Sequence, residues 1–265
     1  MTSATSTRPS SSTGASQDAA DSGCLLEVAA NSVASAQAAQ AGGAGRIELC
    51  AALELGGLTP SHAQIALARE RLRIPLYALI RPRAGDFLYG DDECETMLRD
   101  IEACAALGCD GVVLGVLDAD GNVDMPRCRA LIGAAKGLGV TFHRAIDVSR
   151  DPLRALEDVI ALGCERVLSS GAQPGAATGA DLLQAMLRQA GGRIVVMPGA
   201  GIDADNLVDL RRRTGAREFH ASAKRAWPSG MRHVPRLALG MEQGETRTDV
   251  EEVRRLVSAL AAALD

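Results

Sequence analysis

The chain has 265 residues, of which 47% are hydrophobic and only 2% aromatic, and its formal net charge is −5. This length suits one large α/β domain, and a mildly acidic chain without a sustained basic stripe argues against nucleic acid as the main partner. No apolar run approaches the roughly 18 residues that a membrane span requires, so we expect no membrane partner either.

Residues 1–22 are rich in Ser, Thr and Ala and contain neither an apolar segment nor an Arg-rich face. We therefore expect a disordered N-terminal tail rather than a targeting signal. Residues 23–265 are predicted to form a single domain. Seven scattered cysteines without a CxxC pair are typical of a reducing compartment, which predicts a cytoplasmic protein without a disulfide framework.

From residue 24 onward, short apolar runs alternate with amphipathic stretches, and this pattern predicts strands followed by helices. The predicted strands cover residues 25–30, 46–50, 75–81, 111–117, 140–146, 166–170, 193–198 and 218–222. The predicted helices cover residues 32–42, 60–71, 91–107, 126–137, 151–162, 179–190, 204–213 and 248–263. Eight such units predict an α/β fold of the TIM type, a closed (βα)₈ barrel. An open doubly wound sheet is less favoured, because no GxGxxG motif follows the first strand.

Local signals support several of these boundaries. Asp151-Pro152 places a capping residue before a proline at the first helical position, and Thr248 with Glu251 has the spacing of a capping box. Two near-identical turns, Ala106-Leu-Gly-Cys-Asp110 and Ala161-Leu-Gly-Cys-Glu165, lead from a predicted helix into a strand. A glycine in such a turn ends the helix in the left-handed conformation.

The segment at about residues 223–247, between the last predicted strand and the last helix, is unusually long. It carries five basic side chains: Lys224, Arg225, Arg232, His233 and Arg236. Loops of this length in compact domains are usually lids or contacts with other subunits. A solvated, charged surface is an equally favoured interpretation.

Ionisable residues stand near the ends of several predicted strands, where an unpaired buried charge is costly. The carboxyl ends of barrel strands form the active face of such folds, so we expect these side chains to meet at one mouth of the barrel. The predicted catalytic set is Glu27, Glu48, Arg81, His143 and Arg144. The alternative is a structural ion-pair network that fills the polar end of the barrel.

One hypothesis for this set is an enzyme that acts on a small anionic metabolite, with phosphorylated metabolites included in that class. In that hypothesis Arg81 and Arg144 hold the anion, and His143 or Glu48 transfers protons, because imidazole and perturbed carboxyl groups act as general acids and bases. A third possibility is an oligomeric scaffold whose polar mouth is structural.

A predicted anion-binding set follows the last three strands. Gly199 and Gly201 leave backbone N–H groups free after the seventh strand, His220 and Ser222 end the eighth, and Ser169 adds a hydroxyl after the sixth. Phosphate sites in this fold are frequently built from the loops after strands 7 and 8 and a helix N-terminus. A tight turn without a ligand is the alternative.

Cys50 is the candidate metal ligand, because it alone among the seven cysteines stands at the carboxyl end of a predicted strand. Soft thiolates suit Cu(I), and histidine suits copper or zinc. Most buried free cysteines are small core residues, and that interpretation is favoured for Cys50 as well.

Seven motifs between about residues 24 and 240 together resemble the CutC family, which is named for copper homeostasis. They are Leu26-Glu-Val28, Arg46-Ile-Glu-Leu-Cys50, Glu54-Leu-Gly-Gly-Leu-Thr-Pro60, Ile80-Arg-Pro-Arg83, Gly85-Asp-Phe-Leu-Tyr89, Phe142-His-Arg-Ala145 and Glu218-Phe-His-Ala-Ser222. The resemblance implies a TIM-like barrel, a cytoplasmic location, a homodimer or higher homo-oligomer, and copper as the cofactor of a copper homeostasis protein.

Some members of that family carry a second cysteine directly after the Leu-Glu-Val motif, as a Cu(I) partner for the cysteine of the second strand. In this chain that position is Ala29, whereas the second-strand cysteine is retained as Cys50. The retained Glu, Arg and His residues resemble a small-molecule site more closely than a soft-metal site.

Overall fold

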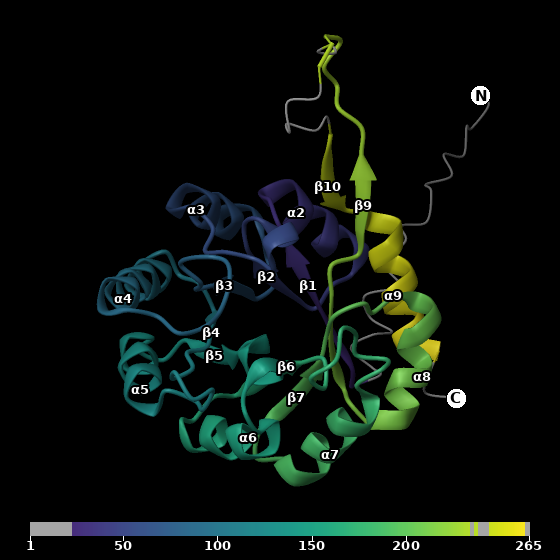
Figure 1. Ribbon diagram of the computed structural model, residues 1–265. Helices are drawn as coiled ribbons and strands as arrows, with labels where there is room; N and C mark the ends of the chain where they lie inside the picture. The colour runs from purple at the N-terminus through teal and green to yellow at the C-terminus, as the bar shows by residue number, and fades with distance from the viewer. Residues whose placement is uncertain (1–22, 234–235, 238–243, 263–265) are drawn as a thin grey trace, which may run out of the picture.

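The computed structural model describes residues 23–233, 236–237 and 244–262, so the predicted tail at residues 1–22 lies outside the described part. Eight parallel strands form one sheet in the order β7-β6-β5-β4-β3-β2-β1-β8, and a parallel bridge between Gly199 and His220 joins the two edges. The sheet therefore curls into a barrel (Figure 1). The barrel strands are β1 (Leu25–Ala30), β2 (Arg46–Leu49), β3 (Leu76–Leu79), β4 (Gly111–Leu114), β5 (Gly139–Phe142), β6 (Arg166–Ser169), β7 (Val195–Pro198) and β8 (Glu218–Ala221).

The helices form an outer ring around the barrel (Figure 1). They are α2 (Val33–Gly42), α3 (His62–Arg71), α4 (Asp91–Ala106), α5 (Met125–Ala134), α6 (Pro152–Ala161), α7 (Ala180–Ala190), α8 (Ala204–Thr214) and α9 (Val250–Ala262), with two 3-10 helices, η1 (Leu53–Leu55) and η2 (Arg144–Val148). The predicted TIM-like (βα)₈ barrel is thus confirmed. Among the described residues, no helix is long and apolar enough to cross a membrane.

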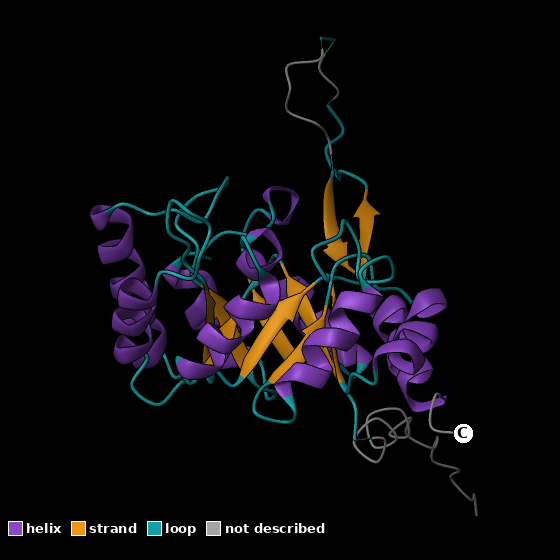
Figure 2. Cartoon of the chain, turned by 60° about the horizontal axis from the view of Figure 1, so that its bottom comes forward, coloured by secondary structure: helices purple, strands orange, loops and turns teal. Residues whose placement is uncertain are grey.

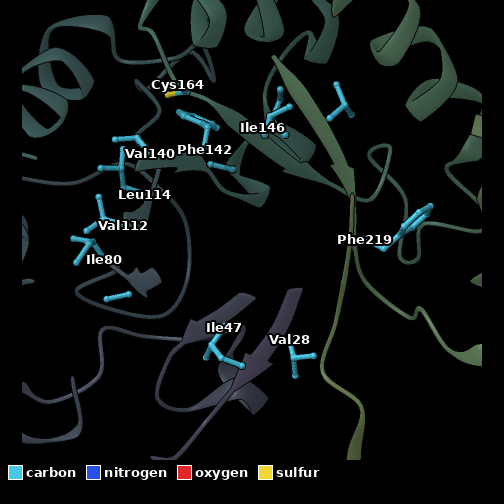
Figure 3. Close-up of a cluster of buried hydrophobic side chains, with 14 of the residues drawn as sticks. Val28, Ile47, Ile80, Val112, Leu114, Val140, Phe142, Ile146, Cys164 and Phe219 are labelled. Carbon is cyan, nitrogen blue, oxygen red and sulfur yellow. The ribbon is translucent and has the colours of Figure 1, made fainter. Parts of the chain in front are cut away.

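Alternation along the strands sends side chains to two different layers. Val28, Ile47 and Val112 belong to the large apolar core between the strands and the helices (Figure 3). Residues of the opposite parity face the barrel interior, because successive side chains of a strand point to opposite faces. Four of these, Cys50, Tyr77, Leu79 and Val113, form a separate small apolar cluster. Other inward positions carry ionisable side chains, among them Glu27, Arg46 and Glu48.

Several predicted boundaries change where side chains bind the backbone. The fifth strand ends at Phe142, because the Nδ1 atom of His143 accepts a hydrogen bond from the Ala145 N–H at 3.2 Å and starts η2. Asp151 caps α6 as predicted. The predicted capping box at Thr248 is wrong, because the Asp249 carboxylate caps α9 instead.

The two Leu-Gly-Cys turns form as predicted. Gly108 ends α4 with a φ of +76°, and Gly163 ends α6 with a φ of +79°. These left-handed conformations are accessible to glycine at little cost, whereas side chains with a Cβ are strained there. The repeated motif therefore marks the same structural junction twice in the barrel.

The segment after β8 contains an antiparallel hairpin, β9 (Lys224–Trp227) and β10 (Glu245–Thr248), which projects from the barrel (Figures 1 and 2). Trp227 is 49% exposed, and the guanidinium of Arg247 lies over its ring at 5.7 Å. The sequence pattern predicts a loop here. The side chains of β9 are all exposed, so no alternation of apolar and polar residues indicates the strand.

Candidate functional site

Four charges of alternating sign, three of them buried and one part-buried, lie in the barrel interior near the amino ends of the strands. We call them the ion cluster: Glu27, Arg46, Arg166 and Glu218. Arg46 donates through Nε to Glu27, which is fully buried. Arg46 Nη2 and Arg166 Nε each donate to Glu218 Oε2 at 2.6 Å. Of the predicted catalytic residues, only Glu27 belongs to the ion cluster, which is a structural network distinct from the one proposed for the polar mouth of the barrel.

Tyr77 packs against the arginines of the ion cluster. The guanidinium carbons of Arg46 and Arg166 lie 5.4 and 5.5 Å from the centre of its ring, within the range of a cation–π contact. A Cβ atom at Gly111 or Gly139 would lie 2.1 or 2.2 Å from atoms of Tyr77. Glycine at these two positions therefore makes room for the aromatic ring inside the barrel.

A cavity of about 550 Å³ lies beyond the ion cluster, toward the carboxyl ends of the strands. This is the position of active sites in barrels of this type. The predicted site residues that line it are Glu48, Cys50, Arg81, His143, Arg144, Gly201, His220 and Ser222. The structure thus brings residues on or directly after β2, β3, β5 and β8 together around one cavity.

His220 connects the ion cluster with the cavity. Its Nδ1 atom lies 2.8 Å from Glu27 Oε1 and 3.4 Å from Glu48 Oε2. Ligating atoms of these three residues lie within 4.8 Å of one another, as in a cation site, but Glu27 is already bound by Arg46 and His220. Because Nδ1 faces the carboxylates, Nε2 is the nitrogen of His220 that is left for a ligand.

The electrostatic environment separates the two carboxyl groups. Burial, together with the neighbouring Glu27, raises the pKa of Glu48 to about 7. Burial also opposes ionisation of Glu27, but Arg46 and His220 outweigh it and lower the pKa of Glu27 to about 2. Burial opposes the charged form of His220, yet its contacts with Glu27 and Glu48 raise its pKa. At neutral pH, Glu27 is ionised, and Glu48 and His220 compete for a proton.

Arg81 is a buried cation on the cavity wall, with 6% of its surface exposed. Its guanidinium donates to the carbonyl oxygens of Leu55 and Gly57 at 3.0 and 2.8 Å and of Gly85 at 2.8 Å. Within the described ranges, no carboxylate forms an ion pair with it. The guanidinium also lies over the Phe87 ring, 5.1 Å from its centre. A buried charge without a counter-charge is incompletely compensated, so an anion in the cavity would complete its environment.

His143 faces the same cavity from the end of β5 and is 5% exposed. Burial, reinforced by the charge of Arg81, lowers its pKa to about 3, so the imidazole is neutral at physiological pH. Its Nδ1 accepts the Ala145 N–H, and its Nε2 has no hydrogen-bond partner among the described residues.

Asp147, a residue that the sequence analysis missed, organises the next part of the rim. It accepts hydrogen bonds from the Ser169 hydroxyl at 2.6 Å and from the Ser170 backbone N–H at 3.0 Å. Arg144 is 42% exposed and donates to Asp147 at 2.8 Å and to the Ser170 hydroxyl at 2.9 Å. Ser169 is therefore engaged with Asp147 and does not line the cavity. The position of Asp147 directly after a predicted strand is the sequence signal that could have identified it as a site residue.

The predicted anion-binding residues divide into two groups. Gly201 and Ser222 line the cavity. Gly199 does not, because its N–H donates to the Ser169 carbonyl at 2.9 Å within the barrel wall. The side chain of Asp203 occupies the N-terminus of α8, where it accepts from two backbone N–H groups. Because a carboxylate already caps this helix, we expect the anion to bind elsewhere in the cavity and not at the N-terminus of α8.

Cys50 is 1% exposed, and its thiol contacts the Ala30 carbonyl oxygen at 3.6 Å. Burial, followed by the nearby Glu48 and Glu54, raises the pKa of the thiol well above its ordinary value. Among the described residues, no cysteine forms a disulfide.

The comparison with known proteins starts from the whole barrel. A sequence profile of the CutC family matches residues 24–225. The chain belongs to the CutC family. A family protein CutC from Xanthomonas campestris pv. campestris (strain B100) is 59% identical over 239 residues, which cover 90% of this chain and 99% of the relative. A second CutC, from Xylella fastidiosa (strain Temecula1 / ATCC 700964), is 58% identical over 236 residues, 89% of this chain and 88% of the relative.

A solved CutC structure supports the architecture. The crystal structure of a CutC from Streptococcus agalactiae, whose name proposes a role in copper homeostasis, is 31% identical and superposes with a TM-score of 0.72. The similarity covers 75% of this chain and 98% of that chain. The resemblance to the CutC family and the single-domain TIM-like barrel are both confirmed.

Proposed function

We propose that this chain binds a small anionic metabolite in the cavity and transfers protons on it through Glu48 and His220. The supporting observation is that a carboxyl group with a pKa of about 7 faces an imidazole at 3.4 Å inside a cavity that also contains Arg81. Groups that titrate near the working pH are effective general acids and bases. A phosphorylated metabolite belongs to the same class of ligand.

Each residue of the cavity has a distinct role in this proposal. Arg81 holds the anion, and Arg144, already paired with Asp147, assists from the rim. Glu27 orients His220 through its hydrogen bond to Nδ1. The sequence analysis offered His143 or Glu48 as the proton-transferring group. The low pKa of His143 favours Glu48, because a group that stays neutral across the physiological range does not exchange protons efficiently.

The first test is stabilisation by anions. Inorganic phosphate and pyruvate, each compared with chloride at equal ionic strength, should raise the melting temperature measured by scanning fluorimetry. At about 100 times Kd the stabilisation is about 2.7 kcal/mol, which corresponds to a shift of about 5–10 °C for a domain of this size. Arg81→Met should abolish the shift, because it removes the incompletely compensated cation.

Arg144→Met is the matched control for that experiment. Its guanidinium already has a carboxylate partner, so this variant should retain most of the shift. An equal shift in wild type and Arg81→Met would show that the anion binds elsewhere. No shift with any anion of the panel would exclude an anion-binding cavity.

Copper is the second candidate, because a relative is named for copper homeostasis and Cys50 lines the cavity. Cu(I) prefers a set of soft ligands. In the described part of the chain, no cluster of three His, Cys, Asp or Glu side chains includes Cys50, and position 29 is Ala. The raised pKa of the thiol also disfavours the thiolate that binds metal. The donor set does not fit a resident Cu(I) ion, and the proposed proton transfer does not involve one.

Cu(I) titration in competition with a chromophoric chelator tests this conclusion. Wild type and Cys50→Ser should take up Cu(I) equally weakly, and Cys128→Ser controls for the other buried thiols. A one-equivalent site that is present in wild type and in Cys128→Ser, but lost in Cys50→Ser, would restore copper as the ligand.

We propose a cytoplasmic protein that forms a homodimer or higher homo-oligomer, and neither nucleic acid nor a membrane is a proposed partner. The described cysteines form no disulfide, which is compatible with a reducing compartment. The projecting hairpin, with Trp227 half exposed, is the surface that we propose for subunit contact or for a lid over the cavity.

A further inference from the structure

The imidazole of His143 has a geometry that suits a hydrogen-bond donor. Gly115, directly after the neighbouring strand β4, leaves the space that the ring occupies, since a Cβ there would lie 2.7 Å from its Cε1 and Nδ1 atoms. On another side the ring packs against Phe87, with ring centres 4.9 Å apart. His143 is therefore held by packing in one orientation on the cavity wall.

The hydrogen bond to Nδ1 determines which nitrogen carries the proton. Because the Ala145 N–H donates to Nδ1, that nitrogen is the acceptor, and the hydrogen of the neutral ring is on Nε2. Nε2 is buried and has no acceptor among the described residues. A buried N–H group without an acceptor is destabilising, so an oxygen atom of a ligand is its missing partner.

Glu48 and His143 approach the cavity from different sides. Glu48 is on β2 and His143 follows β5, three strands away in the sheet order, while Arg81 follows the intervening β3. A ligand between them would meet a base on one side and a neutral N–H donor on the other. A carboxylate base opposite a neutral imidazole donor is an arrangement that supports proton abstraction next to a carbonyl group.

We infer that His143 donates its Nε2 hydrogen to a carbonyl oxygen of the substrate, that the substrate is therefore an anionic carbonyl compound, and that Glu48 abstracts a proton from the carbon next to that carbonyl. This inference rests on the proposed function and specifies its substrate class and reaction. Arg81 binds the anionic group of the same molecule. His143 is a catalytic residue in this scheme, because it contacts the reacting oxygen.

The electrons balance within the substrate. The C–H bond breaks, its proton goes to the Glu48 carboxylate, and its electron pair forms a C=C bond. The carbonyl π pair moves onto the oxygen, where the His143 N–H stabilises the negative charge. Exchange of the Glu48 proton with solvent, followed by return of a proton to the same carbon and of the electron pair to the carbonyl group, restores the substrate with a new hydrogen. No oxidant or second reactant is required.

Deuterium exchange tests the inference directly. Pyruvate, 2-oxobutyrate and dihydroxyacetone phosphate are incubated with the protein in D₂O, and loss of the signal of the hydrogens next to the carbonyl is followed by ¹H NMR against a protein-free control. At least one probe that raises the melting temperature through Arg81 should exchange faster than the control. If probes bind in this way and none exchanges, the inference is overturned while the anion-binding function stands. If none binds, the proposed function itself fails.

Variants at His143 separate catalysis from structure. His143→Phe keeps a ring against Phe87 but removes the N–H donor, and it should keep the anion-induced thermal shift while exchange slows by about 100–1000-fold, as when one oxyanion donor is removed. His143→Gln offers an amide donor, so its exchange rate should lie between those of wild type and His143→Phe. Exchange in His143→Phe within about threefold of wild type would overturn the role of His143.

A measurement on the wild-type protein covers the case in which these variants do not fold. In ¹⁵N-histidine NMR, the Nε2–H signal of His143 should shift when an exchanging probe binds, and the ring should stay neutral from pH 5 to 9. Titration of His143 within that range, or an unmoved Nε2–H signal in the complex, would contradict the assignment.

Discussion

Replacing Arg46 with Met should destabilise the protein by about 3–5 kcal/mol, the usual effect of removing one partner from a buried ion pair. The reason is that Glu27, fully buried, would lose the cation that keeps it ionised, and Glu218 would lose one of its two arginines. The change is measured by urea unfolding at pH 7. Arg99→Met is the matched control, since its exposed pair with Glu95 should contribute no more than about 1 kcal/mol.

The pH dependence of this loss follows from Glu27. In wild type its pKa is lowered to about 2, so its contribution to stability is present above its ordinary pKa and is lost as the pH falls toward 2. Without Arg46, burial favours the protonated form. The deficit of Arg46→Met should therefore be largest above about pH 5 and should shrink toward pH 3. A deficit that does not change with pH would mean that Glu27 is not the charge left uncompensated.

Glu48→Gln should have the opposite effect and stabilise the protein above pH 7. The pKa of Glu48 is raised from 4.5 to about 7, so the folded state binds its proton more tightly than the unfolded chain does. This contribution is fully present below the unfolded pKa and is lost as the pH rises through about 7. The loss amounts to about 3 kcal/mol, and glutamine, which does not ionise, should remove it.

Unfolding free energies of wild type and Glu48→Gln between pH 4.5 and 8.5 provide the measurement. Glu54→Gln, an exposed carboxyl on the same segment, should follow wild type. Glu48→Gln should also abolish any hydrogen exchange on a carbonyl probe, since the base is lost. If Glu48→Gln and wild type keep parallel stability profiles, Glu48 does not have a raised pKa and is not the base.

The fold could be predicted almost completely because it depends on periodicity. Buried parallel strands appear as apolar runs, and covering helices appear as amphipathic stretches. The sequence therefore predicts where strands and helices alternate along the chain. Errors occurred where a single side chain determines a boundary. Asp249 rather than Thr248 caps the last helix, and His143 ends its strand by capping η2.

The candidate site was predictable as a set of inward-facing residues. The sequence did not separate the residues of the ion cluster from those that line the cavity. Glu27 and Glu48 both lie on barrel strands, and the alternation of side chains alone predicts that both line the cavity. The structure assigns them differently because Arg46 lies beside Glu27 in the neighbouring strand, whereas within the described part of the chain Glu48 pairs with His220 and with no arginine. Asp147 was missed for a related reason, since its partners Ser169 and Ser170 come from another βα unit.

The sequence by itself determined the barrel, the face on which each strand residue lies and membership of the CutC family. Only the tertiary structure decided which buried charges are compensated. Glu27 and Arg46 pair, while Arg81 is held by backbone carbonyls of its own loop and of the preceding βα loop and by no carboxylate in the described residues. The physical reason is that the energy of a buried charge depends on partners a few ångströms away, and in a closed barrel those partners come from strands that are distant in sequence.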